Sequence, residues 1–290
     1  MGSKDKVQKS VADRFDLSGK VAAITGAGGA LCGAMADALG AAGVKVAVLD
    51  IGGEKAEARA RAIVAAGGTA QAFPCDVLDD AALKECRRAV CDRWGAPDFL
   101  INGAGGNHPR GSTSEEFYTI DDPADTAERS FFDLAAGDFR RVFDLNFMGA
   151  FLTSQTFARE MIAKGKGAIV NISSMSAFTP LTKVVAYSAA KAALSNFTQW
   201  LAVHFAHTGV RVNALAPGFF MTEQLKFLHI DRQTGELLPR AQKVIAHTPM
   251  GRYGEPDDLV GPLVWLLSDA SRFVTGVVVP IDGGFSSYTI

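Results

Sequence analysis

The sequence predicts an α/β fold, in which a doubly wound parallel sheet of about seven strands forms a single domain. Three observations indicate this class. Short apolar runs rich in β-branched residues alternate with segments of helical periodicity, glycine-rich turns separate them, and 48% of the 290 residues are hydrophobic. That fraction supplies a substantial core and excludes general disorder. Repeated strand–helix–strand units give parallel strands with right-handed crossovers and helices on both faces.

The elements follow in order along the chain. Residues 20–25 (KVAAIT) predict the first strand, residues 26–33 (GAGGALCG) form a turn that opens the first helix, and Gly43 ends that helix. Residues 1–18 are polar and are expected to form an arm before a domain of residues 19–290. Further strands are expected at 44–49, 69–75, 99–102, 168–173, 210–214 and 277–280, and helices at 54–66, 81–94, 139–163, 187–206 and 256–268.

Two long segments, 103–137 and 218–248, interrupt this rhythm. Turn residues punctuate both, and each begins where a strand ends. Ligands of doubly wound sheets bind beyond the carboxyl ends of the strands, and loops of this length in compact domains tend to be functional. We therefore predict that the two segments form walls of a substrate pocket, with surface elaboration as the alternative.

Charge and composition narrow the class of ligand. Lys and Arg number 29 against 31 Asp and Glu, a net charge of −2 with no block of like charge, which argues against nucleic acid or an anionic membrane as partner. No apolar run is long enough for a membrane span or a signal peptide, so we expect a cytoplasmic protein with a small-molecule substrate. The four cysteines and five histidines lack metal-ligand spacing, so we expect free thiols and no metal.

The turn at 26–33 has the features of a pyrophosphate site. Its backbone N–H groups and the positive end of the following helix can meet a phosphate. Asp50 ends the second strand 24 residues after Gly26, where a carboxylate accepts hydrogen bonds from a ribose 2′-OH and repels a 2′-phosphate. This pair predicts a Rossmann-type site for NAD rather than NADP. The alternative is a packing turn with a helix-capping aspartate.

A second constellation, Ser174, Tyr187 and Lys191, predicts acid–base chemistry. The spacings are 13 and 4 residues, so the serine follows a strand while the tyrosine and lysine share one helix face. A phenol with a pKa of about 10 is a poor acid–base group at neutral pH unless a nearby ammonium lowers that pKa. The serine hydroxyl can hold a substrate oxygen while a proton moves, which suits hydride transfer by a nicotinamide.

With these motifs in place, the sequence from Leu17 to its end resembles the short-chain dehydrogenase/reductase family. Ala30 and Cys32 depart from the family turn, which usually has glycine at both positions, and the stretch between Asn102 and Asn146 is longer than the family's. The motifs that carry the resemblance are Thr25-Gly26 with its turn, Asp76-Val77, residues 102–105 (NGAG), Asn146, the set Ser174, Tyr187 and Lys191, residues 217–222 (PGFFMT), and Asp282-Gly283-Gly284.

The resemblance implies a role for each matching residue. Tyr187 is expected to be the general acid–base, with Ser174 positioning the substrate oxygen. Lys191 is expected to bind the nicotinamide ribose and lower the pKa of Tyr187, and Asn146 to hold a water in the proton relay. A homotetramer is also implied, with a dimer as the alternative. The implied coenzyme-binding residues are Gly26, Gly28, Gly29, Leu31, Asp50, Ile51, Asp76, Val77, Asn102, Ala104, Gly105, Tyr187, Lys191, Pro217, Gly218, Phe220 and Thr222.

Within the family, the strings INGAGGNHP, NISSMSAFTPLTK and APGFFMTEQ are similar to those of the D-mannonate oxidoreductases of the short-chain type, also called fructuronate reductases. This implies interconversion of D-mannonate and D-fructuronate with NAD(H). The expected substrate-binding residues are Asn107, His108, Ser174 and Tyr187. Further side chains could bind the substrate or its carboxylate, with a solvated surface role as the alternative for each: Arg110, Lys183, His229, Arg232, Arg240 and His247.

Several alternatives stay open from the sequence. One is reduction of the gluconate 5-dehydrogenase type, a second is an apolar steroid or fatty ketone as substrate, and a third is a non-catalytic dinucleotide-binding regulator. A carrier-protein ketoreductase that uses NADP is disfavoured, because Asp50 is followed by Ile51 and Gly52 rather than by basic residues.

Overall fold

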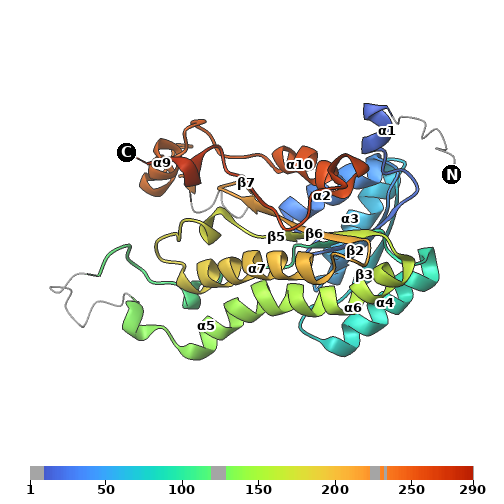
Figure 1. Cartoon of the computed structure of the whole chain (residues 1–290). Helices are drawn as coiled ribbons and strands as arrows, with labels where there is room; N and C mark the ends of the chain where they lie inside the picture. The colour runs from blue at the N-terminus through green and yellow to red at the C-terminus, as the bar shows by residue number, and fades with distance from the viewer. Residues whose placement is uncertain (1–9, 119–128, 223–228, 232–233, 290) are drawn as a thin grey trace, which may run out of the picture.

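The computed structural model describes residues 10–118, 129–222, 229–231 and 234–289. These residues form one parallel seven-stranded sheet in the order β3-β2-β1-β4-β5-β6-β7, which confirms the predicted doubly wound single domain (Figure 1). The strands are β1 (Val21–Thr25), β2 (Lys45–Asp50), β3 (Thr69–Pro74), β4 (Phe99–Asn102), β5 (Gly167–Ile172), β6 (Val210–Pro217) and β7 (Val278–Ile281).

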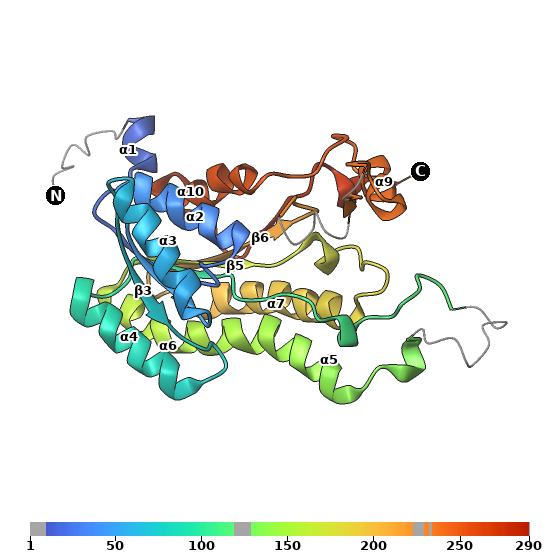
Figure 2. The same cartoon turned by 180° about the vertical axis from the view of Figure 1, so that it is seen from behind.

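Helices cover both faces of this sheet. Figures 1 and 2 show α2, α3 and α10 on one face and α4, α6 and α7 on the other. Their bounds are α2 (Ala30–Ala41), α3 (Gly53–Ala65), α4 (Asp80–Trp94), α6 (Gly149–Lys164), α7 (Val185–His204) and α10 (Val260–Leu267). Shorter 3-10 helices lie at Pro109–Gly111, Phe131–Asp133, Met175–Ala177, Pro256–Leu259, Asp269–Ser271 and Phe285–Ser287.

Successive strand residues supply two separate cores, because side chains alternate between the faces of a sheet. In β1, Ala22 and Ile24 join the cluster under α2 and α10, whereas Val21 and Ala23 join the cluster under α4, α6 and α7. Burial on both faces explains why the inner strands β1, β2, β4, β5 and β6 are largely continuous apolar runs in the sequence. Full burial of a side chain such as Ile24 stabilises the fold by roughly 1.5–3 kcal/mol.

One helix differs from the sequence-based expectation in a way that matters for the site. The segment expected as a single helix over 139–163 forms α5 (Ala136–Phe143), a π-helical turn (Asp144–Met148) and then α6. In this turn the Gly149 N–H donates to Asp144 O, the carbonyl five residues back. Apolar periodicity does not reveal a single extra residue in a helix, because helical spacing continues on both sides of it.

Both long segments leave the sheet at the carboxyl end of a strand, the first after β4 and the second after β6. The second contains α9 (Pro239–Ala246). Residues 119–128, 223–228 and 232–233 of these segments lie outside the described part of the protein. At the other end of the sequence, the expected polar arm finishes in a short helix, α1 (Val11–Phe15), which Ser10 caps.

Candidate active site

A cleft of about 610 Å³ lies at the carboxyl ends of β1, β2, β3 and β4. Its volume falls within the range of small-molecule sites, about 300–1,000 Å³. The edge of the sheet that forms it is the one where doubly wound folds bind ligands. Most of the expected coenzyme residues line this cleft: Gly26, Gly28, Gly29, Leu31, Asp50, Ile51, Asp76, Val77, Ala104, Gly105 and Thr222.

The glycine-rich turn is held against the end of β4. Gly26 has a φ of +69°, and a Cβ there would lie 3.0 Å from the backbone of Ala104, so a side chain at this position is excluded twice. Thr25 Oγ1 accepts hydrogen bonds from the N–H groups of Gly103 (3.0 Å) and Ala104 (3.1 Å). These bonds join the first and fourth strands into one wall of the cleft.

Asp50 lines the cleft at the end of β2. Its Oδ2 accepts from the Gly28 N–H (3.0 Å) and its Oδ1 from the Gly52 N–H (2.8 Å), so the carboxylate is fixed beside the glycine-rich turn. Sequence reasoning missed Lys55, which lines the same cleft. The position of Lys55 could have been inferred from the start of α3 shortly after Asp50, because Lys55 lies in the first turn of that helix and lines the cleft.

The departure from the family turn at Cys32 has a steric explanation. A Cβ on Gly103 would lie 2.1 Å from Cys32 Sγ, so the thiol fills the space that a side chain at position 103 would need. Burial raises the pKa of Cys32 to about 12, so this thiol is neutral and packs as a small apolar group. Cys32 and Gly103 are therefore complementary residues on facing walls.

Asn102 is the last residue of β4. Its amide donates to Ser154 Oγ and to Asn171 Oδ1, both at 2.8 Å, and the side chain is buried beneath the cleft instead of lining it. Asn171 in turn donates to Thr198 Oγ1 (2.8 Å). The Asn102 side chain therefore supports β4 and β5 from below, and the expected place of this residue along the adenosine ribose stays a prediction.

The expected nicotinamide clamp at 217–222 is only partly at the cleft. Thr222 lines it, whereas the ring of Phe220 is 5% exposed and packs against Gly254. The Gly218 N–H donates to Ile281 O (2.9 Å), which continues the pairing of β6 with β7 beyond Pro217. Phe220 and Gly218 thus support the segment that carries Thr222, and the expected clamp on the nicotinamide stays a prediction.

The expected catalytic residues meet at the end of β5 and the start of α7. Ser174 Oγ accepts from the Ser176 N–H (3.2 Å) and is hydrogen-bonded to the Tyr187 phenol. Lys191 is 4% exposed, donates from Nζ to Ile172 O (2.8 Å), and has Nζ 5.5 Å from the centroid of the Tyr187 ring. The spacings of 13 and 4 residues therefore correctly predicted which side chains lie together.

The pKa of Tyr187 differs from the expectation. Burial raises this pKa above its usual value, and the hydrogen bond with Ser174 offsets only part of the effect. The net lowering of the pKa that was expected from Lys191 is not found, because burial is the largest effect on Tyr187. The Lys191 ammonium lies by the ring and bonds to Ile172 O. Burial also lowers the pKa of Lys191, to about 8. At neutral pH the phenol is protonated and the ammonium is charged.

Asn146 is positioned by the π-helical turn. Its amide donates to Val142 O (2.8 Å) and Gly106 O (2.7 Å), and its Oδ1 accepts from the Gly106 N–H (3.1 Å). A Cβ on Gly105 would lie 2.6 Å from Asn146 Oδ1 and 3.3 Å from Lys191 Nζ. Asn146 and Lys191 thus converge on the cleft floor at Gly105.

Asn107 and His108, which are expected to bind substrate, make hydrogen bonds within the start of the first long segment. The Asn107 amide donates to Ser112 Oγ (2.9 Å), and His108 Nδ1 accepts from the Arg110 N–H (3.2 Å), which caps the 3-10 helix at Pro109–Gly111. These contacts engage polar atoms of both side chains in the loop itself. The expected role of both residues in substrate binding stays a prediction.

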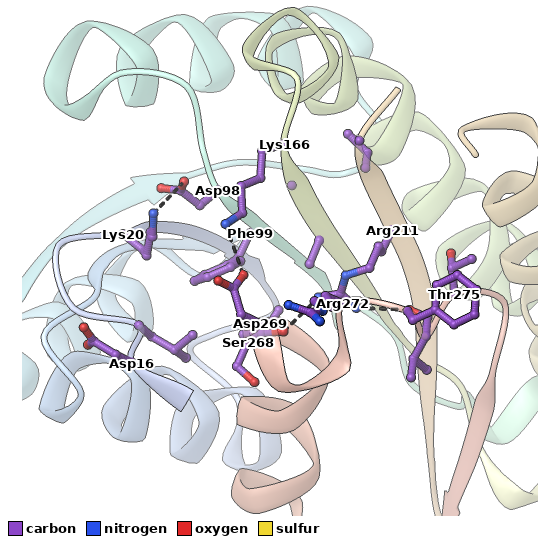
Figure 3. A pocket seen from close by; sticks show the side chains of 18 of the residues that line it. Asp16, Lys20, Asp98, Phe99, Lys166, Arg211, Ser268, Asp269, Arg272 and Thr275 are labelled. Atoms are coloured by element: carbon purple, nitrogen blue, oxygen red, sulfur yellow. Dashed lines mark hydrogen bonds and ion pairs between the residues drawn. The ribbon is translucent and has the colours of Figure 1, made fainter. Parts of the chain in front are cut away.

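A second cavity, of about 760 Å³, lies at the opposite, amino-terminal edge of the sheet (Figure 3). Lys20 lies 3.8 Å from Asp98, and Lys166 lies 3.1 Å from Asp269. Arg211 donates to backbone carbonyl groups of the surrounding loops. These charged side chains are thus bound to one another or to the backbone, which is typical of structural contacts rather than of reacting groups.

Over the described ranges, no helix has the length and apolarity needed to cross a bilayer. Within the same residues, no group of three or more His, Cys, Asp or Glu side chains could hold a metal ion.

Comparisons with known proteins identify the family. A family model described as enoyl-(acyl carrier protein) reductase matches residues 26–286. The uncharacterized oxidoreductase UxuB of Bacillus subtilis is 52% identical over 276 residues, which are 94% of this chain and 97% of that protein. A Haemophilus influenzae crystal structure with bound NAD, provisionally assigned as a D-mannonate oxidoreductase, shares 46% identity and a TM-score of 0.91 over 97% of this chain and 99% of that one.

A third similar protein is a gluconate 5-dehydrogenase from Burkholderia cenocepacia, whose crystal structure contains NADP and tartrate. It shares 30% identity and a TM-score of 0.81, over 97% of this chain and 100% of that one. The present protein belongs to the short-chain dehydrogenase/reductase family. It is an oxidoreductase of the kind that acts on alcohol groups.

Proposed function

We propose that this enzyme interconverts D-mannonate and D-fructuronate, the secondary alcohol and the ketone of one sugar acid, with NAD(H) as coenzyme. The observation that carries the proposal is the assembly of Ser174, Tyr187 and Lys191 beside a cleft that Asp50 lines. The similar structure from Haemophilus influenzae supports both the substrate and the coenzyme.

The residues of the cleft fit NAD. A Cβ on Gly28 would lie 2.8 Å from Lys55 Cβ and 3.0 Å from Asp50 Oδ2, so this part of the turn must be glycine to stay open. Each Asp50 oxygen accepts one backbone N–H and has a further lone pair for a ribose hydroxyl. The same negative charge disfavours the 2′-phosphate of NADP. Asp76, Val77 and the exposed side chain of Ile51 would bind the adenosine end.

The proposed mechanism assigns a task to each residue of the catalytic group. The chemistry that bound NAD supplies is hydride transfer to or from the substrate carbon. Ser174 Oγ holds the substrate oxygen, and the Tyr187 phenol gives a proton to that oxygen during reduction and takes it back during oxidation. Lys191 stabilises the developing phenolate by its charge. Asn146 orients the relay that returns the proton to solvent.

The experiment that tests this function is a comparison of initial rates of reduced-coenzyme oxidation with D-fructuronate, 5-ketogluconate and an apolar ketone, each with NADH and with NADPH. We expect fast turnover of D-fructuronate with NADH, at least about tenfold slower with NADPH because of charge repulsion at Asp50. Activity on 5-ketogluconate in place of D-fructuronate would contradict the substrate and favour the second candidate, a gluconate 5-dehydrogenase. The similarity to the Burkholderia cenocepacia enzyme favours that candidate.

We also propose that the enzyme is a homotetramer. An aromatic ladder crosses the outer face of α5, α6 and α7, and neighbouring rings in it lie 4.7–6.5 Å apart. Trp200 in this ladder is 57% exposed and Val203 beside it is 78% exposed, which is typical of an interface. The members of the ladder are Phe139, Phe143, Phe147, Phe151, Phe197, Trp200 and His204.

The oligomer can be tested by light scattering after gel filtration. We expect a mass near four times the protomer mass of 30.6 kDa, and smaller species for Trp200→Glu because the interface would bury an unpaired carboxylate. Lys166→Glu, on the opposite edge of the sheet, is the control and should leave the mass unchanged. A monomeric wild type would refute the assignment.

A further inference from the structure

The two long segments meet at the end of the molecule that carries the catalytic group. Glu116, in the first segment, accepts from Arg240 Nη1 (3.3 Å) and from Lys243 Nζ (3.2 Å), both on α9 of the second segment. Figure 1 shows the first segment, α9 and the start of α7 at the same end of the structure. The contact is therefore a bridge between the two predicted walls of the substrate pocket.

A further residue connects this bridge to the catalytic helix. Lys183, four residues before Tyr187, donates from Nζ to Ser114 O and lies 4.0 Å from Glu115. Its φ of +70° is rare for a residue other than glycine, and its carbonyl accepts from the Thr113 N–H (2.9 Å). These contacts hold the first segment directly against the entrance to α7, next to Tyr187.

The bridge combines charges of both signs. Among the residues that the structure describes, three cations, Lys183, Arg240 and Lys243, face the two carboxylates of Glu115 and Glu116. Arg240 has a side chain only 36% exposed, and among the residues that the structure describes its guanidinium donates to Glu116 alone, through Nη1. The edge formed by its Nε and second Nη nitrogen is left for another acceptor.

Arg240 also acts on the inner side of the second segment. Burial lowers the pKa of His229, and the charge of Arg240 lowers it further. His229 is hydrogen-bonded to Tyr253 (2.6 Å) and contacts the ring of Phe219, directly after Gly218 at the end of β6. Arg240 therefore stands between the bridge at the surface and the wall that continues from β6.

We propose that Arg240 is the residue that determines specificity for an acidic substrate, by binding its carboxylate through the free edge of the guanidinium. A guanidinium edge matches a carboxylate with two parallel hydrogen bonds, which an ammonium cannot reproduce. Glu116 holds the guanidinium in place through its contact with Arg240 Nη1. This inference rests on the proposed function, since it requires a sugar acid as substrate.

The test compares D-fructuronate with D-fructose, its neutral counterpart with a hydroxymethyl group in place of the carboxylate, in steady-state NADH assays. For Arg240→Gln we expect the KM for D-fructuronate to rise about 10- to 100-fold with little change in kcat, and kcat/KM for D-fructose to stay within about threefold. Arg240→Lys should be intermediate, because it keeps the charge and loses the two-pronged edge. Lys243→Gln, which loses contact with the same Glu116, is the matched control and should change each KM by less than about threefold.

The outcomes separate this inference from the proposed function. A wild type that prefers D-fructose to D-fructuronate would overturn the proposed function and this inference with it. A wild type that prefers the acid, combined with an Arg240→Gln variant of unchanged preference, would overturn only the role of Arg240. An equal loss on both ketoses in Arg240→Gln and Arg240→Lys would also overturn it, because a binding role for the carboxylate predicts a loss on the acid alone.

Discussion

Replacing Tyr187 by phenylalanine is expected to lower kcat by about 100- to 10,000-fold, the range that a positioned general acid–base contributes. The ring stays, so packing is kept and only the phenolic oxygen next to Ser174 is lost. Affinity for NADH should stay within about twofold, because Asp50 and the glycine-rich turn are untouched. The measurements are NADH absorbance for turnover and NADH fluorescence for binding.

The pH dependence of the rate also distinguishes the wild type from the Tyr187→Phe variant. Because burial raises the pKa of Tyr187, the phenol is protonated at neutral pH, and ketone reduction should vary little between about pH 6 and 8. Alcohol oxidation needs the deprotonated form and should rise with pH in the wild type. Ser188→Ala is a suitable control, since its neighbouring buried hydroxyl has no hydrogen-bond partner within the described residues. Full activity of the phenylalanine variant would refute the mechanism.

The second large effect is expected for Gly103→Ala. The added Cβ would lie 2.1 Å from Cys32 Sγ and 3.0 Å from Thr25 O, so the walls of the coenzyme cleft must move apart. Overpacking of this kind costs about 1–3 kcal/mol in the free energy of unfolding. We therefore expect a lower midpoint in thermal denaturation and a weaker affinity for NADH, since Gly103 lines the cleft.

A second substitution tests the steric cause. Cys32→Ala removes Sγ and leaves Cys32 Cβ 3.5 Å from the new methyl group, an ordinary contact, so the double variant should recover much of the lost stability. Gly137→Ala, in α5 with nothing within 4 Å of the added Cβ, should be neutral or slightly stabilising. If Cys32→Ala lowers the stability of both backgrounds equally, the clash is not the cause.

The fold was predictable because its signals are local. Strands buried on both faces appear as continuous apolar runs, and a glycine directly follows β1, β4 and β6 at the edge where ligands bind. The catalytic group was predictable for a similar reason: Tyr187 and Lys191 share one helix face by spacing alone. The position of Ser174 then follows from the parallel neighbours β5 and β6.

The directions in which side chains point at strand ends were not predictable. Asn102 and Gly103 are consecutive, yet the first side chain is buried between β4 and α6 while the second residue lines the cleft, because neighbours in a strand face opposite ways. To decide from sequence which of the two residues faces the coenzyme, one needs to know which face of the sheet each position of β4 points to, and only the packed sheet supplies this. The same limit applies to Asn107 and His108, whose partners are set by a local turn.

The ion pairs between the two long segments could not be predicted from the sequence either. Glu116 and Arg240 are 124 residues apart, and each belongs to a segment without regular periodicity. No local pattern relates them, although the sequence did indicate that both segments leave the sheet at its ligand-binding edge. Lys55 was not predicted as a cleft residue, because a lysine on a helix rich in charged residues is typical of a solvated surface.

In the π-helical turn at Asp144–Met148, the number of residues is more constrained than the identity of their side chains. Each residue of an α-helix adds about 100° of rotation, so the one residue gained in the turn sets the phase between α5 and α6. Val142 on α5 packs against Gly111, where an added Cβ would lie 2.9 Å from Val142 Cγ2, while Asn146 faces the cleft floor. Deleting a single residue here would give a more regular helix but rotate one of these two contacts out of register. Evolution of this enzyme can therefore exchange side chains around the turn far more readily than it can insert or delete a codon within it.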